Sequence, residues 1–358
     1  MSMDHSISLG VVGYGGRGRG MCRLASSFPG VTIVAACDTA ADKLDLARED
    51  YPDARTFDDF EAMLSSGTLT ALLVETPGWD HAGFCVRGLE HGLHVMSDVP
   101  FVYTVEEGEK LWEADQNSDS LFMCGANPNM WGFIQAAVDL YEQGFLGEPY
   151  YMETEYIHNL GSLFVTTPWR SRFPSIKYCT HSLGPLLRIL KEDLREVACF
   201  GTSAPVSGLP NYHDAMTALF QTDCGAVVKL TTCFANHFKG GNHSCRIFGA
   251  HGYFERFSGR GGLAGPFTTF NSSKLTGAEA PMKLDVDTML PAYAQKAANT
   301  GHGGADYVLF DRFFEAIRTN GPSPVNLRDG LRMTLPGIFA AESAANGGEK
   351  TRIVYPWD

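Results

Sequence analysis

The chain lacks a long hydrophobic run, an excess of positive charge and any closely spaced pair of cysteines. No apolar stretch approaches the roughly 20 residues of a membrane-spanning helix. The first residues show no basic segment followed by an apolar one, so we expect no signal peptide. Acidic residues outnumber basic ones, 41 to 28, for a formal net charge of -13. Nucleic acids and anionic membranes bind basic surfaces, so we expect neither as a partner.

The nine cysteines are scattered along the chain, and no C-x-x-C pair occurs. This spacing disfavours a zinc site and a disulfide framework and indicates a reducing, cytoplasmic location. We therefore expect no metal site. Because 358 residues with 44% hydrophobic content exceed one ordinary core, we expect two globular domains.

What the sequence does contain, at its start, is an apolar run from Ile7 that leads directly into the motif G-x-G-x-x-G. Gly13 allows a tight turn, Gly15 lets the backbone approach a pyrophosphate, and Gly18 lets the next helix pack closely. A second apolar run ends in Asp38, at the spacing expected for an acid on an adenosine ribose. That acid would repel a 2′-phosphate, so the motif predicts NAD rather than NADP. A purely structural glycine turn is the alternative.

The first third of the chain alternates β-branched apolar runs with helical stretches, a rhythm typical of a doubly wound parallel sheet. We expect strands at 7–13, 31–38, 70–76, 93–97 and 121–125, and helices at 43–51, 57–64 and 81–91. Ligands of such sheets bind outside the carboxyl ends of the strands. The candidate binding positions are therefore 13–19, 38, 76–81, 98–100 and 127.

After residue 126 the pattern changes to strand-like runs with few helices between them, which predicts a predominantly antiparallel, open sheet. We expect strands at 150–158, 196–201, 215–221, 226–235 and 244–249, and helices at 133–143, 307–319 and 327–345. Segment 256–287 is expected to be a surface excursion or an edge hairpin. The sequence thus predicts an α/β Rossmann domain over 1–126 and an α+β substrate and oligomerisation domain over 127–358. The last helix is free to pack back on the first domain.

The run from Tyr151 to His158 reads as a strand, and alternate residues of a strand share one face. Thr154, Tyr156 and His158 should therefore point the same way, with Ile157 on the other face. Such a face offers a phenol and an imidazole to a ligand. A solvated sheet face is the alternative interpretation.

A further candidate segment surrounds Pro185, which fits the first turn of a helix but not its interior. A helix is therefore expected to begin near His181 or Ser182, with Tyr178 and His181 at its mouth rather than buried along it. The pKa of an imidazole suits proton transfer near neutral pH, and the neighbouring Arg170 and Lys177 favour a site. A structural role for a single histidine at a helix start is the alternative.

A loop with three glycines in four residues surrounds His302 and precedes Asp306 and Tyr307. It is short enough to close on a ligand. A simple loop before a helix, with Asp306 in the first turn, is the alternative.

Together these motifs resemble the Gfo/Idh/MocA family of NAD(P)-dependent, mainly sugar-modifying proteins. The resemblance extends over nearly the whole chain, including the turn at Thr76-Pro77. Common members carry Glu-Lys-Pro after a strand and a D-x-G-x-H motif, which serve ordinary dehydrogenation. Here the first motif reads Asp98-Val99-Pro100, and the second reads K-x-C-x-H, with only His181 matching. This departure disfavours an ordinary dehydrogenase.

The chain resembles one branch of this family, the NAD-dependent α-N-acetylgalactosaminidases, more than it resembles the common members. This branch shares an acidic-Val-Pro triplet, a strand like 156–160, a segment like 178–185 and a His-Gly-Gly loop like 302–304, although Cys179 replaces a proline. The resemblance implies catalytic roles for Tyr156, His158, Tyr178 and His181. It implies substrate contacts at Arg170 and, less directly, at Tyr307 and Lys177, with a solvent-facing lysine as the alternative. It implies that NAD contacts Gly13, Gly15, Gly16, Arg17, Gly18, Arg19, Asp38, Pro77, Trp79, His81, Asp98, Val99 and Asn127.

The activity that this resemblance implies is that of a redox-neutral glycosidase acting on a small sugar or glycoside. A sugar hydroxyl is oxidised, the aglycone is eliminated, water adds, and the sugar is reduced again. His181 would act as acid/base with Tyr178, Tyr156 or His158 would move the second proton, and Arg170 would orient sugar oxygens. A sugar or cyclitol dehydrogenase with net NAD(H) turnover and a non-catalytic NAD-binding sensor are the alternatives. A homodimer or homotetramer is expected through the C-terminal sheet.

Overall fold

The computed structural model describes residues 6–237, 241–259, 265–277, 280–286, 297 and 299–358. The chain divides into two compact units. The first comprises residues 1–126 and 300–331, and the second comprises residues 127–299 and 332–358. The domain limits expected from the sequence, 1–126 and 127–358, remain a prediction about functional units.

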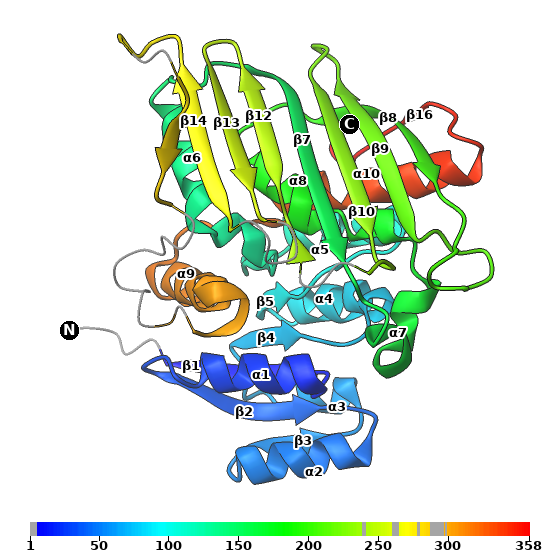
Figure 1. Cartoon of the computed structure of the whole chain (residues 1–358). Coiled ribbons are helices and arrows are strands. Elements are labelled where there is room, and N and C mark those ends of the chain that lie inside the picture. Colours follow the sequence, from blue (N-terminus) through cyan, green and yellow to red (C-terminus); the bar gives the residue numbers. More distant parts are fainter. Residues whose placement is uncertain (1–5, 238–240, 260–264, 278–279, 287–296, 298) are drawn as a thin grey trace. The chain divides into compact units, whose positions relative to one another are not determined.

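The first unit is built on a parallel sheet of six strands (Figure 1). These are β1 (Ile7–Val12), β2 (Val31–Cys37), β3 (Arg55–Phe57), β4 (Ala71–Val74), β5 (His94–Ser97) and β6 (Phe122–Cys124). Their order is β3-β2-β1-β4-β5-β6. This order confirms the predicted Rossmann fold, and it reverses between β1 and β4, where such sheets bind ligands. β3 was not predicted, because its three residues are partly exposed and form no apolar run.

The helices of this unit lie close to the expected ranges 43–51, 57–64, 81–91 and 307–319, whereas α5 (Val105–Gln116) was not predicted. They are α1 (Gly16–Ala25), α2 (Ala41–Asp50), α3 (Phe60–Leu64), α4 (His81–Glu90), α5 (Val105–Gln116) and α9 (Ala305–Thr319), with 3₁₀ turns η1 (Gly78–Asp80) and η6 (Gly301–Gly304). Helix α1 contacts α9, and α4 contacts α5. The ring of Phe28, which follows α1, packs against Phe314 of α9 at 5.4 Å between centroids. Aromatic packing therefore holds α9 in the first unit.

The second unit contains a sheet of ten strands. They are β7 (Pro149–His158), β8 (Leu194–Gly201), β9 (Ala215–Thr222), β10 (Val227–Cys233), β11 (Gly241–Asn242), β12 (Cys245–Gly249), β13 (Gly252–Phe257), β14 (Phe267–Ser272), β15 (Met282–Leu284) and β16 (Thr351–Arg352). Only β7 and β10 pair in parallel among the described strands of this sheet, so the predicted, predominantly antiparallel character is confirmed. In segment 256–287 the described part includes β14 paired with β15 at the sheet edge, as an edge hairpin would be.

Short helices accompany this sheet. They are η2 (Asn127–Met130), α6 (Gly132–Glu142), α7 (Leu163–Thr166), η3 (Pro168–Arg172), η4 (Ser175–Tyr178), α8 (Thr180–Leu187) and α10 (Leu327–Ala345), whose residues from 332 onward belong to this unit. Figure 1 shows α6, α8 and α10 gathered along one face of the sheet. Along β9, Met216, Ala218 and Phe220 are buried whereas Leu219 is 51% exposed, so the opposite face is open. No helix in the described part of the chain is long and apolar enough to cross a membrane.

The sequence-based placement of Pro185 was wrong. α8 begins at Thr180, one or two residues before the expected start, and Pro185 lies in its interior rather than in its first turn. All eight residues of α8 are buried. Tertiary packing therefore outweighs the loss of one helical hydrogen bond at the proline.

Candidate active site

The glycine turn between β1 and α1 is shaped by close backbone contacts. Gly13 has a φ of +90°, and a Cβ at Gly18 would lie 2.0 Å from the carbonyl oxygen of Gly13. At Gly15 and Gly16, by contrast, a Cβ would meet nothing within 4 Å. Two of these glycines are thus required by the protein itself, and two leave open space at the N-terminus of α1, where backbone N–H groups favour an anion.

Asp38 follows β2 and is held by two backbone groups. The N–H of Tyr14 donates to Oδ2 at 2.7 Å, and the N–H of Ala40 donates to Oδ1 at 2.9 Å. Each carboxylate oxygen retains a lone pair that can accept a ribose hydroxyl. The turn and Asp38 therefore fit a dinucleotide of the NAD type.

The two arginines predicted to contact the cofactor are held by carboxylates. Arg17 donates from Nε to Asp98 at 3.2 Å and from its two terminal nitrogens to Asp306 at 2.8 and 3.2 Å. Arg19 forms a bidentate pair with Asp50 at 2.6 and 2.9 Å. Burial alone would raise the pKa of Asp306, but hydrogen bonds from His302 and Arg17 lower it below its ordinary value. The guanidinium groups are therefore fixed by the protein before any ligand arrives.

Sequence reasoning missed Glu75, which follows β4 directly. Its side chain is 1% exposed, and neither carboxyl oxygen has a hydrogen-bond partner among the described residues. The Nε of Arg17 lies 3.9 Å from Oε2. Burial and the neighbouring Asp98 carboxylate raise the pKa of Glu75 well above its ordinary value, which favours the neutral acid. An acidic residue directly after a fully apolar strand was the signal in the sequence.

His81, another predicted cofactor residue, is engaged by the protein on both ring nitrogens. Nε2 lies 2.6 Å from the carbonyl oxygen of Thr76, and Nδ1 lies 3.0 Å from the carbonyl oxygen of Asp98 and 3.3 Å from the hydroxyl of Ser97. Burial lowers the pKa of this imidazole, which favours its neutral form. His81 thus links the segments that follow β4 and β5. The other predicted positions in these segments are the exposed Pro77 and Trp79 and the buried Val99.

In the second unit, the structure brings the four predicted catalytic side chains together. The Tyr178 hydroxyl lies 3.3 Å from Nε2 of His181, and both residues are buried. The Tyr156 ring packs edge-on against Tyr178 at 5.3 Å and lies face to face with His158 at 4.4 Å between centroids. This confirms that Tyr156 and His158 share one face of the strand. Because Tyr156 is 7% exposed, the alternative of a solvated face is wrong for it.

A histidine that sequence reasoning did not single out completes this group. Nε2 of His243 lies 2.7 Å from Nε2 of His158, and its ring packs edge-on against Tyr156 at 4.8 Å. No motif marked His243, since its partner is 85 residues away along the chain.

The predicted substrate residues lie in different surroundings. The Arg170 guanidinium stacks on the rings of Trp169 at 4.6 Å and Tyr178 at 5.3 Å, and its buried Nε has no hydrogen-bond partner among the described residues. Lys177 is half-buried in η4. In the first unit, the Tyr307 ring packs on Phe28 at 4.6 Å. Asn127, predicted to contact the cofactor, is buried in η2 of the second unit.

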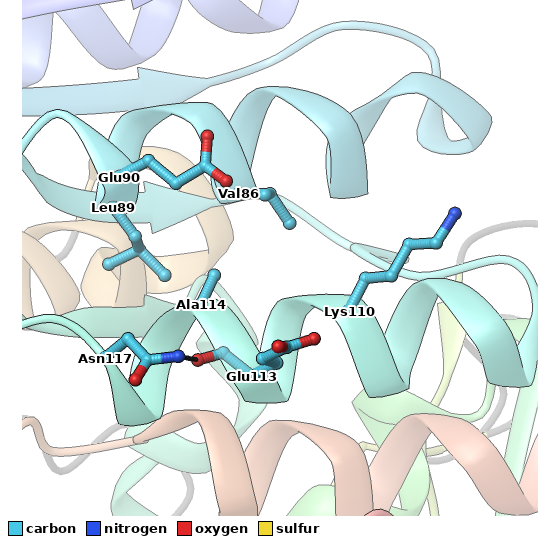
Figure 2. A pocket seen from close by; sticks show the side chains of 7 residues that line it. All are labelled: Val86, Leu89, Glu90, Lys110, Glu113, Ala114 and Asn117. Carbon is cyan, nitrogen blue, oxygen red and sulfur yellow. Dashed lines mark hydrogen bonds between the residues drawn. The ribbon is translucent and has the colours of Figure 1, made fainter.

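A hollow of about 520 Å³ lies beside α4 and α5. Figure 2 shows the residues that line it, Val86, Leu89, Glu90, Lys110, Glu113, Ala114 and Asn117. None of the predicted site residues lines it. Within the described ranges, no group of three or more His, Cys, Asp and Glu side chains could hold a metal ion.

Comparison with known proteins finds a different family model for each end of the chain. Residues 7–126 match the Gfo/Idh/MocA oxidoreductase family, NAD-binding Rossmann fold, and residues 213–354 match the C-terminal domain of glycosyl hydrolase 109. The chain thus contains a Gfo/Idh/MocA NAD-binding Rossmann domain and a glycosyl hydrolase 109 C-terminal domain. Its Rossmann domain binds NAD.

The chain is similar over most of its length to curated relatives and solved structures. It is 26% identical to a glycosyl hydrolase family 109 protein of Saccharopolyspora erythraea, over 94% of this chain and 80% of the relative. An oxidoreductase from Agrobacterium radiobacter in complex with NAD⁺, L-tartaric acid and magnesium superposes with a TM-score of 0.80 at 17% identity, over 97% of this chain and 98% of the other. A levoglucosan dehydrogenase with NADH and levoglucosan gives 0.82 at 15% identity, over 97% and 99%. At such identities the solved structures establish the fold.

Proposed function

We propose that this protein is an NAD-dependent enzyme that acts on a sugar or glycoside as a redox-neutral glycosidase. The observation that carries the proposal is the buried contact between Tyr178 and His181, 3.3 Å from hydroxyl to Nε2, in a unit with a glycosyl hydrolase 109 domain. Val99 occupies the position of the lysine in the Glu-Lys-Pro motif of ordinary dehydrogenases, which argues against ordinary dehydrogenation. The glycine turn and Asp38 are the residues that would hold NAD.

Bound NAD supplies a reversible hydride acceptor for the carbon of a sugar hydroxyl. The side chains of this chain manage the protons. Tyr178 takes the proton of that hydroxyl while its own passes to Nε2 of His181, and the direction reverses when the hydroxyl is restored. The carbonyl formed in between acidifies the adjacent C–H, whose proton Tyr156 or His158 removes. The aglycone then leaves by elimination, and water adds to the double bond.

Arg170 orients the substrate in this proposal. Its guanidinium is fixed by stacking on Trp169 and Tyr178, and its terminal nitrogens would donate to sugar oxygens. A planar, fixed donor of this kind selects oxygen positions rather than total charge. Lys177 and Tyr307 remain proposed substrate contacts.

A panel of aryl glycosides tests this function, with aglycone release and nicotinamide absorbance followed together. We expect aglycone release without net NADH. Stoichiometric NADH without aglycone would identify a sugar or cyclitol dehydrogenase instead. If neither signal appears while NAD binds, the protein is a non-catalytic sensor.

We further propose a cytoplasmic location and a homodimer or homotetramer. All nine cysteines are free, and seven of them are buried, which suits a reducing compartment. The open face of the ten-stranded sheet exposes Leu219 to 51% and Phe200 to 65%, which suits a self-association surface.

A further inference from the structure

Two imidazoles of the second unit meet directly, nitrogen to nitrogen. Nε2 of His158 and Nε2 of His243 lie 2.7 Å apart, and their ring centroids are separated by 4.7 Å. At this distance one nitrogen carries the proton and the other accepts it. The Tyr156 ring contacts both, stacking on His158 and meeting His243 edge-on. The two histidines therefore hold one shared proton beside a predicted catalytic phenol.

The backbone around His243 is built to bring it there. Strand β11 pairs with the end of β7, so that Gly241 is opposite His158. Asn242 donates to Glu155 at 2.7 Å, and the N–H of His243 donates to the hydroxyl of Ser258 at 3.1 Å. A Cβ at Gly241 would lie 2.2 Å from Nε2 of His158. Only glycine at this position lets the two rings approach, and the contact thus follows from the pairing of the two strands.

We propose that His158 and His243 form a proton-sharing pair that serves as the second acid–base group of the reaction, with His243 as its positioning residue. This inference rests on the proposed function, and it assigns to the pair the second proton transfer that the mechanism left to Tyr156 or His158. His243 fixes the orientation of the His158 ring and shares the proton that His158 gains.

The proton balance of the pair is simple. In the neutral form that the proposal requires, His158 donates its Nε2–H to Nε2 of His243, so the basic lone pair of His158 is on Nδ1. That Nδ1 takes the proton from the sugar carbon, the electrons of the broken C–H bond form a C=C bond, and the aglycone leaves with the electrons of its C–O bond. The charge gained is shared across the hydrogen bond between the rings, and the pair then returns the proton to the aglycone oxygen. A second proton would place two cations in contact, so the pair carries one at a time.

Two substitutions at His243 separate this role from simple packing. His243→Gln keeps an amide that can bond to His158 but cannot take a proton, and His243→Ala leaves space. We expect both to lower kcat for aglycone release about 100-fold, the scale of one acid–base group, with KM within about twofold. Added imidazole should restore His243→Ala but not His243→Gln. The control is His91→Gln, which alters an exposed histidine of the first unit and should leave kcat unchanged.

Several outcomes would overturn the role. One is a kcat within about threefold of the wild type in both variants, against the expected 10²-fold loss. Another is a raised KM with an unchanged kcat, which would make His243 a substrate contact. A third is loss of activity with EDTA and recovery with Zn²⁺, which would make the two imidazoles metal ligands.

Failure of the proposed function would look different, since wild-type protein would release no aglycone from any glycoside. The pair can still be tested in that case by NMR of protein labelled with ¹⁵N-histidine. We expect a coupling between the two Nε2 atoms and two widely separated protonation steps, both lost in His243→Gln. Independent titration of the two rings in the wild type would refute the shared proton.

Discussion

At the scale of single residues, the candidate site combines side chains of two kinds. Tyr156, Tyr178 and His181 were identified from the sequence because they lie in motifs, and the structure brings them into contact. His243 and Glu75 were not identified, because their significance depends on what surrounds them after folding. The type and spacing of residues indicate which reactions their side chains could take part in. Burial and neighbouring groups in the folded protein decide which of these roles a side chain has.

His181 supplies the most direct prediction at this scale. His181→Ala removes the imidazole that faces the Tyr178 hydroxyl and should lower aglycone release by 10²–10⁴-fold, the usual contribution of an acid–base group. NAD binding, measured by titration of nicotinamide fluorescence, should be unchanged, because the glycine turn and Asp38 are intact. Full activity in His181→Ala would remove this residue from the mechanism.

Glu75 supplies a prediction about pH. Its pKa in the folded protein is raised above the ordinary 4.5, so the stability that its neutral form provides is complete below that pH and declines as pH rises toward the folded pKa. Glu75→Gln removes this decline. The variant should therefore gain free energy of unfolding over the wild type as pH rises above about 4.5, by at most about 1.4 kcal/mol for each pH unit until the folded pKa is reached.

Urea unfolding of both proteins across that pH range measures the effect. Glu109→Gln, an exposed glutamate of α5, is the matched control and should show no such trend. If the free energy of unfolding changes with pH in the same way in the wild type and in Glu75→Gln, the raised pKa of Glu75 is contradicted.

At the scale of elements, the turn between β1 and α1 shows why position matters more than glycine content. Gly18 and Gly20 both lie on α1, yet only Gly18 faces the backbone of the turn, where a Cβ would lie 2.0 Å from the Gly13 oxygen. The same scale explains the error at Pro185. Helix rules describe isolated segments, whereas α8 is buried on all sides and is held by its neighbours.

A pair of alanine substitutions tests the turn. Gly18→Ala should displace the start of α1, weaken NAD binding at least about tenfold and lower the midpoint of thermal unfolding, because a backbone clash cannot be relieved by a rotamer change. Gly20→Ala, whose Cβ meets nothing within 4 Å, should bind NAD normally and gain about 0.5–1 kcal/mol in stability from helix propensity. If the two substitutions change NAD affinity and thermal stability equally, the close contact between Gly18 and the backbone of Gly13 is not required for NAD binding.

At the scale of the whole molecule, the chain consists of an NAD-binding Rossmann unit and a unit with an open sheet. The open face carries exposed apolar side chains, including Leu219 and Phe200, between ion pairs such as Arg246 with Glu153. A mixed face of this kind is typical of interfaces between subunits. The open face of the sheet therefore predicts that copies of this chain associate with one another.

Leu219→Glu should shift the mass measured by light scattering after size exclusion from a dimer or tetramer toward the monomer, because it places a charge in the proposed interface. Val165→Glu is the control, since Val165 is 80% exposed on α7, outside the sheet. A wild-type protein that is already monomeric would disprove the proposed assembly.

The sequence by itself determined those features that local spacing encodes. These are the glycine turn, the acid after β2, the alternation of strands and helices, and the shared face of Tyr156 and His158. Each depends on residues close together in the chain, where backbone geometry relates position to direction.

Only the tertiary structure decided which distant groups meet. Arg17 pairs with Asp306 across 289 residues, and His158 meets His243 across 85. The burial that raises the pKa of Glu75 and the packing that admits Pro185 into a helix are likewise sums over many long-range contacts. No local pattern contains such sums, because the free energy of a buried charge or contact depends on everything that excludes water from it.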